Sequence, residues 1–225
     1  MKIALPVALF SLVALASAVA AEAPIPVVKE PRHKTTFENE YLRVIDVRVP
    51  AGDVTLYHVH VLPSVVVYLA KATNRTQTWG ESTSTPRSVS PGESRYVPYD
   101  EKPLTHQGSN PGPALFHVLD IELLKPAPSG TPAPAAAPAG AKLSWEEKRV
   151  RTYNVSVEAG GQAEFPANAS AHLVIGIAGD VRATTAKGAP RQLGNGEFEF
   201  LPPQARVQLN NTGKAKAEVV VLELK

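Results

Sequence analysis

The chain contains one sequence pattern twice. When residues 37–70 are shifted by 108 positions, apolar, charged and turn residues fall on residues of matching type. The agreement resumes at a shift of 104, where Gly92 and Pro98 correspond to Gly196 and Pro202. A repeat of about 100 residues indicates two copies of one structural unit. The pairs matched at the first shift include Phe37 with Trp145, Glu38 with Glu146, Arg43 with Arg151, Val47 with Val155, Val49 with Val157, Ala51 with Ala159, Gly52 with Gly160, Val66 with Val174, and Ala70 with Ala178.

A segment rich in proline and alanine, residues 126–141, separates the two copies. This composition cannot build a hydrophobic core, and proline favours an extended form. With 225 residues in all, each copy is long enough to bury a core of its own. We therefore expect domains over residues 21–125 and 143–225, joined by a linker over residues 126–142.

Each copy is expected to be all-β. Short segments rich in valine, isoleucine and tyrosine alternate with glycine and proline turns, and no segment of the mature chain has a helical period. Many short strands of this kind indicate a sandwich or a barrel. In the first copy we expect strands at residues 42–49, 56–61, 65–70, 76–79, a segment ending at 98, 104–106 and 115–124.

Residues 1–20 have the form of a secretory signal peptide. A basic Lys2 precedes an apolar run over residues 3–16, and Ala18 and Ala20 form a small-x-small cleavage site. The run is short for a membrane span, and the alternative is a buried N-terminal helix. No cysteine follows it that could carry a lipid. We expect a periplasmic or secreted protein without a membrane anchor.

Composition excludes several function classes. The chain has no cysteine, so disulfides, thiolate metal sites and cysteine nucleophiles are ruled out. The net charge is +2 and no basic run stands out, so neither nucleic acid nor an anionic membrane is an expected partner. The sequence contains no Gly-x-Ser-x-Gly elbow, phosphate-binding glycine loop or zinc-protease motif.

Two histidines in the first copy point to metal chemistry. His58 and His60 are two residues apart in an expected strand, so both side chains face the same side. Two other histidines are not expected to be metal ligands. His33 lies in an extended lead-in over residues 21–36 and is expected to be solvated, and His117 is expected to be a hydrogen-bonded structural residue.

Around this pair the chain resembles the cupin superfamily of small β-barrels. The first cupin motif is a glycine, five residues, His-x-His, three or four residues, a glutamate, six residues and a glycine. Gly52, His58 and His60 match it. Ser64 or Val65 stands where the glutamate belongs, and the closing glycine is absent.

The second cupin motif is also matched in part. Gly92 and Pro98 open it, and His106 with Asn110 has the closing spacing. Asp100 replaces the middle glycine, and the gap before the histidine is three residues longer than in the motif. The resemblance covers residues 37–125 and 145–225, and implies two tandem cupin-like jelly-roll barrels.

The resemblance implies that His58, His60 and His106 hold a divalent metal ion, which could be iron, manganese, nickel, copper or zinc. Three neutral imidazoles suit a borderline ion and leave positions open for water or substrate. With no carboxylate in the set, the site would keep its positive charge and favour an anionic ligand. Ser64 and Tyr68 share the strand parity of the histidines and are expected to line the same pocket. The alternative is a metal-free barrel with the histidines as polar lining.

The second copy has lost these ligands. Pro166 and Asn168 stand at the positions of His58 and His60, and Val207 stands where His106 would lie. His172 falls at the glutamate position of the first motif. We therefore expect a degenerate second barrel that packs against the first or binds a partner.

Three functions remain open. The first is a metal-dependent enzyme, dioxygenase-like or isomerase/lyase-like, acting on a small organic substrate. The second is a non-catalytic periplasmic protein that binds a small anion or a sugar. The third is a structural or interaction module. The resemblance also allows a homodimer, because cupins often pair through their sheets.

Overall fold

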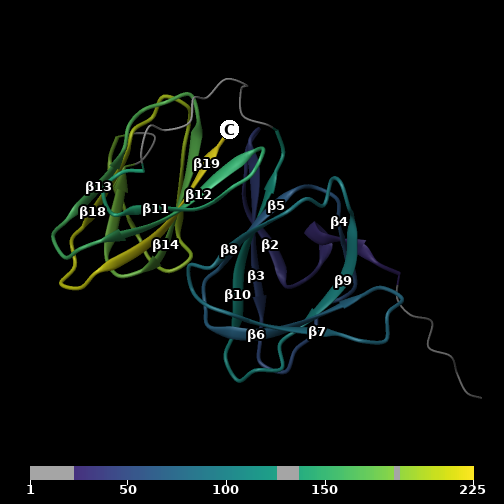
Figure 1. Cartoon of the computed structure of the whole chain (residues 1–225). Helices are drawn as coiled ribbons and strands as arrows, with labels where there is room; N and C mark the ends of the chain where they lie inside the picture. Colours follow the sequence, from purple (N-terminus) through teal and green to yellow (C-terminus); the bar gives the residue numbers. More distant parts are fainter. Residues whose placement is uncertain (1–22, 126–136, 185–187) are drawn as a thin grey trace, which may run out of the picture.

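The computed structural model describes residues 23–125, 137–184 and 188–225. It shows two β-sandwich barrels side by side, one from each half of the chain (Figure 1). Within the described ranges the one helical element is a short 3₁₀ turn, η1, at Val27–Lys29. The all-β, two-barrel fold expected from the sequence is confirmed.

The first barrel consists of two five-stranded sheets. One has the strand order β1-β4-β9-β6-β7, and the other has the order β2-β3-β10-β5-β8. The strands are β1 (Ile25–Pro26), β2 (His33–Glu38), β3 (Leu42–Val49), β4 (His58–His60), β5 (Ser64–Tyr68), β6 (Ala72–Thr78), β7 (Thr85–Val89), β8 (Ser94–Val97), β9 (Leu104–Ser109) and β10 (Phe116–Leu123).

The second barrel repeats this topology. Its sheet β11-β12-β19-β14-β17 has the same strand order as β2-β3-β10-β5-β8, and it is paired with the four-stranded sheet β13-β18-β15-β16. The strands are β11 (Ala141–Glu146), β12 (Val150–Val157), β13 (Gln162–Phe165), β14 (Ala171–Ala178), β15 (Val181–Thr184), β16 (Pro190–Leu193), β17 (Phe198–Leu201), β18 (Val207–Asn211) and β19 (Ala217–Leu224).

A buried asparagine shows how closely the two copies correspond. The Asn110 side-chain amide donates to the backbone oxygens of Val49 and Ala114, and its own oxygen accepts from the nitrogen of Gly112. Asn211 makes the equivalent three bonds in the second barrel. The amide satisfies backbone groups at a turn that would otherwise be buried without partners. This residue type is therefore required by the turn in both copies.

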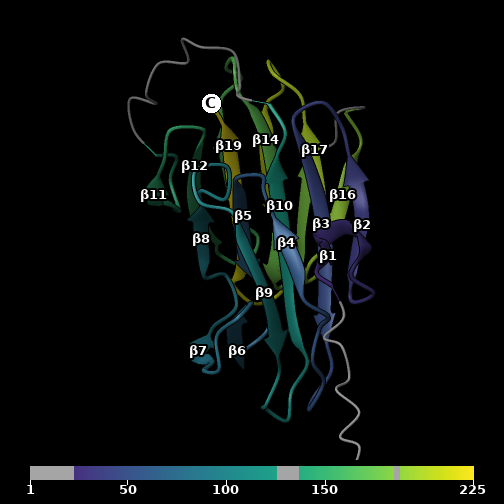
Figure 2. The ribbon, with the colours of Figure 1, turned by 90° about the vertical axis from the view of Figure 1, so that its right-hand side faces the viewer.

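The two barrels share one hydrophobic core. Side chains from β3, β5 and β10 form one cluster with side chains from β14 and β19. Figure 2 shows the facing sheets, with β5 and β10 in front of β19 and β14. At the edges, the rings of Phe37 and Phe198 lie 6.0 Å apart, and the Trp145 indole nitrogen donates to the backbone oxygen of Ser94 at 3.2 Å. The second barrel thus covers an apolar face of the first.

Several local predictions need correction. β7 is an additional strand between the expected strand at 76–79 and the expected segment ending at 98, and β6 begins four residues before its expected start at 76. The lead-in over residues 21–36 contains β1, η1 and the start of β2. β11 begins at residue 141, inside the expected linker.

Residues 1–20, expected to be a signal peptide, and residues 126–136 of the linker lie outside the described residues. Among the residues that are described, no helix is long and apolar enough to cross a membrane.

Candidate metal centre

The structure brings His58, His60 and His106 together inside the first barrel. β4 pairs antiparallel with β9, and His58 lies directly opposite His106 in that register. The three ring centroids are 4.5 to 5.1 Å apart, and one nitrogen of each ring lies within 4.8 Å of the others. Strand alternation and cross-strand pairing thus place three imidazoles around one point.

The free nitrogens of this triad face one another without partners. The Nδ1 atom of His58 donates to the backbone oxygen of Leu56 at 2.8 Å, which leaves Nε2 as the lone-pair nitrogen. That Nε2 and both ring nitrogens of His106 are buried and have no hydrogen-bond partner in the described part of the chain. Buried polar atoms are rarely left unpaired in folded proteins, so these atoms indicate a missing ligand.

Burial also keeps two of these imidazoles, those of His58 and His106, neutral. It lowers the pKa of His58 to about 3 and the pKa of His106 to about 2, and the neighbouring histidines add to both effects. A neutral imidazole is the form that binds a metal ion. The donor set therefore fits a borderline divalent ion with positions left open.

A carboxylate beside the triad corrects one expectation from the sequence. Asp120 on β10 is buried, and its Oδ2 lies 3.3 Å from Nδ1 of His60. Burial alone would raise the pKa of Asp120, but the neighbouring His60 holds that pKa below its usual value. A carboxylate at Nδ1 directs Nε2 of the imidazole toward a metal. Part of the positive charge of an ion here is therefore offset, although no carboxylate belongs to the triad itself.

Tyr99 limits the movement of His60. Its ring stacks on the imidazole with centroids 4.6 Å apart and an interplanar angle of 25°. Both side chains are buried. His60 is thus flanked by the stacked Tyr99 ring on one side and by the Asp120 carboxylate at Nδ1.

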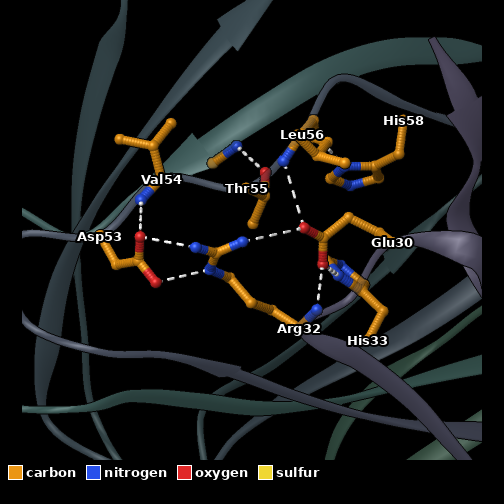
Figure 3. A network of polar contacts seen from close by, with 9 residues as sticks. Glu30, Arg32, His33, Asp53, Val54, Thr55, Leu56 and His58 are labelled. Carbon is orange, nitrogen blue, oxygen red and sulfur yellow. Dashed lines mark hydrogen bonds and ion pairs between the residues drawn. The ribbon is translucent and has the colours of Figure 1, made fainter.

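A polar network from the N-terminal segment borders the site (Figure 3). Glu30 is almost fully buried and accepts hydrogen bonds from the backbone nitrogens of Arg32 and Leu56 at 2.6 and 3.1 Å. The Arg32 guanidinium binds both carboxylate oxygens of Asp53 at 2.6 Å. β1 pairs in parallel with β4, with Ile25 opposite His58. The segment therefore ties down the strand that carries two of the triad histidines.

His33 is part of this network, and its prediction as a solvated surface residue is wrong. The side chain is buried, its Nδ1 lies 2.5 Å from Glu30 Oε2, and its ring centroid lies 4.5 Å from that of His58 (Figure 3). No sequence pattern indicates this position, because the short β1–β4 pairing that brings the segment to the barrel is a tertiary contact. His117 lies outside the cavity and pairs with Asp46 at 2.7 Å.

The triad opens into a cavity of about 70 Å³. Tyr68 is among the lining residues, together with His33, Tyr99 and Asp120. Ser64 is not. It is fully buried on β5, which belongs to the sheet opposite β4, and its hydroxyl donates to the Leu62 oxygen at 3.3 Å. Val66 and Tyr68 line the cavity from the same face of β5, whereas Ser64 is the first residue of that strand and is not among the lining residues.

The equivalent region of the second barrel is filled. The Asn168 amide donates to Glu223 Oε1 at 3.0 Å, and Phe165 and Val207 belong to the barrel's core cluster. His172 is fully buried, with neither ring nitrogen hydrogen-bonded to a described residue, and burial lowers its pKa. The metal-competent cluster found among the described residues is the one in the first barrel.

One further site residue, Asp120, could have been suspected from the sequence. Asp120 interrupts an otherwise apolar strand pattern, and a charge at such a position usually has a buried partner. Arg95 lines the cavity from β8, a strand that the sequence located only by its end. Glu30 and His33 carried no comparable signal.

No protein-family model and no curated protein matches this chain. Solved structures do match its fold. A cupin 2 conserved barrel domain protein from Leptotrichia buccalis is 10% identical, with a TM-score of 0.53 over 86% of this chain and 88% of that one. The nickel(II) complex of the bacterial pirin YhhW from Escherichia coli is 17% identical, with a TM-score of 0.59 over 85% and 90%.

The third structure is Bacillus subtilis oxalate decarboxylase, which has Mn(II) centres. It is 15% identical, with a TM-score of 0.56 over 82% of this chain and 69% of that one. These identities are too low to transfer an activity, but the alignments extend over both barrels. Together with the repeated topology and the histidine cluster, they show that this chain has the cupin fold, present as two tandem barrels.

Proposed function

We propose that the first barrel binds one divalent transition-metal ion through His58, His60 and His106, and that the protein acts on a small organic molecule in the adjoining cavity. The observation that carries the proposal is the set of buried, partnerless nitrogens on His58 and His106 that converge with His60. The nickel in YhhW and the manganese in oxalate decarboxylase, both held by proteins of this fold, support it.

The chain's own residues define the environment of the ion. The three neutral imidazoles would hold it, and Asp120 and Tyr99 would keep His60 in place. When bound, the ion would supply Lewis-acid or redox chemistry at its open positions. The apolar part of the lining, which includes Val47, Val66 and Phe116, would limit the access of water.

The proposed activity is that of a metal-dependent enzyme, dioxygenase-like or isomerase/lyase-like. The cavity size supports a substrate of only a few non-hydrogen atoms. The leader-like residues 1–20 support export, so the proposed location is the periplasm or the cell exterior.

The test is metal content in a matched pair of variants. His106→Gln removes a ligand whose ring has no other hydrogen bond, so the fold should survive. His60→Ala is less suitable, because it would leave Asp120 buried without its partner. His117→Gln is the control, since it removes another histidine of the same barrel outside the cavity.

We expect about one equivalent of metal in the wild type and in His117→Gln, measured by elemental analysis after purification without chelator. His106→Gln should retain little or none while keeping the wild-type circular dichroism spectrum. Equal metal content in both variants would refute the proposed ligand set.

A further inference from the structure

The second barrel holds an edge strand of the first barrel that leads to the metal centre. Among the described strands, β8 pairs with β5 alone, so it forms one edge of its sheet. The indole nitrogen of Trp145 on β11 donates to the Ser94 hydroxyl on β8 at 3.0 Å and to the Ser94 backbone oxygen at 3.2 Å. Tyr96, also on β8, packs against the core that the two barrels share. Contacts from the second barrel therefore fix this edge strand.

A salt bridge extends the contact into the loop that follows β8. Arg149 lies in the turn between β11 and β12, and its Nη2 is 3.3 Å from Asp100 Oδ2. The turn itself is held on both sides. The backbone oxygen of Arg149 accepts from the nitrogen of Lys225 at 2.8 Å, and the nitrogen of Glu147 donates to the oxygen of Val150 at 2.9 Å. The Arg149 side chain thus extends from a turn that is tied to the rest of the second barrel.

The loop that contains Asp100 also carries a residue of the metal centre. Asp100 directly follows Tyr99, whose buried ring stacks on the imidazole of His60. Backbone hydrogen bonds of 3.0 to 3.1 Å close the turn over residues 97–102. The chain then enters β9, the strand that carries His106. A shift of Asp100 would therefore move Tyr99 relative to His60.

We propose that the second barrel positions Tyr99 against His60 through the salt bridge between Arg149 and Asp100, and thereby strengthens metal binding in the first barrel. A ligand residue that is already held in place loses less conformational freedom when the ion binds. The inference rests on the proposed function, because His60 is one of the proposed ligands. It adds a role for a barrel whose own site is filled. Arg149 is a positioning residue that acts through Asp100 and Tyr99.

The chain offers a matched control for Arg149 at the other edge of the contact between the barrels. β2 and β8 are the two edges of the same sheet. Arg191 lines a groove beside Phe37 of β2, and it pairs with Glu199 of its own barrel at 3.5 Å. Arg149→Gln and Arg191→Gln therefore make the same change in net charge on the second barrel, near the loop of Tyr99 and away from it.

The first measurement is the dissociation constant for zinc, obtained by competition with a chromophoric chelator. Arg149 and Asp100 are both partly exposed, so replacing either should leave the fold intact. We expect Arg149→Gln and Asp100→Asn each to raise the constant about two- to fivefold, and the double variant to raise it no further. Arg149→Lys keeps the charge and should restore most of the affinity. Arg191→Gln should leave the affinity unchanged.

A second pair of variants tests whether the effect passes through Tyr99. Tyr99→Leu removes the stacked ring and should weaken zinc binding at least as much as Arg149→Gln does. In that background, adding Arg149→Gln should have no further effect on the dissociation constant. An equal effect of Arg149→Gln with and without the Tyr99 ring would show that Arg149 does not act through this side chain, and would overturn the inference.

Hydrogen exchange of the metal-free chain tests the contact independently of the metal. The amides of the turn over residues 97–102 should exchange several-fold faster in Arg149→Gln than in the wild type or in Arg191→Gln. Unchanged exchange there, or equal zinc affinities of the two arginine variants, would overturn the inference. A chain that takes up no metal but shows faster exchange only in Arg149→Gln would refute the proposed function and support the positioning contact.

Discussion

Asp120 Oδ2 lies 3.3 Å from Nδ1 of His60, between two side chains that are each at least 95% buried. The cupin pattern places a glutamate among the metal ligands, and this chain has Ser64 or Val65 there instead. The structure has a carboxylate, Asp120 on β10, next to the imidazole of His60 and not among the proposed ligands themselves. The negative charge then acts on the ion through an imidazole and also selects the tautomer of that imidazole.

Replacing this carboxylate should weaken metal binding without removing a ligand. Asp120→Asn keeps the shape of the side chain but loses its charge, and we expect the metal dissociation constant to rise about 10–100-fold. Competition with a chromophoric chelator measures it. Asp46→Asn is the control, because Asp46 makes the same kind of contact with His117 outside the cavity. Equal metal affinities for the two variants would contradict a role for Asp120 in the site.

The N-terminal network should contribute measurably to stability. Glu30→Gln replaces a buried carboxylate that accepts from two backbone nitrogens and faces His33, and we expect a loss of about 1–3 kcal/mol in the free energy of unfolding. Urea denaturation measures the loss. Glu40→Gln is the matched change at an exposed residue paired with Lys125 at 3.7 Å, and should cost less than about 0.5 kcal/mol. Comparable losses in the two variants would show that the network is not a stabilising element.

The shared core predicts that both barrels unfold together. Leu222 is fully buried in the cluster common to the two barrels, so Leu222→Ala should cost about 2–5 kcal/mol. In a Trp79→Phe background, the one remaining tryptophan, Trp145, reports on the contact between the barrels, while metal release reports on the first barrel. We expect the two signals to have the same midpoint in urea and to shift together in Leu222→Ala. Separate midpoints would show that the barrels unfold independently.

The same contact predicts the behaviour of the first barrel alone. A truncated chain of residues 23–125 would expose the apolar face of β3, β5 and β10 that the second barrel covers. We expect this fragment to aggregate or to bind a hydrophobic dye, as measured by light scattering and dye fluorescence. A monomeric, dye-negative fragment would show that the second barrel is dispensable for folding of the first.

Much of the fold could be predicted from the sequence because the signals were local or repeated. Turn glycines such as Gly52 and Gly160 recur at a fixed spacing, and both adopt positive φ angles in the structure. Strand β7 was missed because the composition of Thr85–Val89 is typical of a loop, and only its pairing with β6 makes it a strand. The low β propensity of this segment is outweighed by its pairing with β6.

The site could be predicted only in part. Strand alternation predicts that His58 and His60 face the same side. His106 was identified from the second cupin motif and not from the pattern of the residues around it. His33 reaches the cavity, and Glu30 contacts His33 beside it, through the two-residue pairing of β1 with β4, which no periodicity reveals. Ser64 was misplaced because parity gives the face on which a residue lies but not its position along the cavity: Val66 and Tyr68 on that face of β5 line the cavity, and Ser64 at the start of the strand does not.

His172 in the second barrel should make the protein sensitive to acid. Burial lowers the pKa of its imidazole from the ordinary 6.5, so below about pH 6.5 the unfolded state binds a proton that the folded state does not. Stability therefore falls as the pH falls, by up to about 1.4 kcal/mol per pH unit for this one group, until the pH reaches the folded-state pKa.

His172→Leu removes the group. Urea denaturation of metal-free wild type and variant at pH 7, 6 and 5 should show the variant gaining stability relative to the wild type as the pH decreases. Burial also lowers the pKa of His58 and of His106, but both residues are present in wild type and variant, so their contributions cancel in the difference. Stability curves that stay parallel from pH 7 to 5 would show that His172 does not contribute to acid sensitivity.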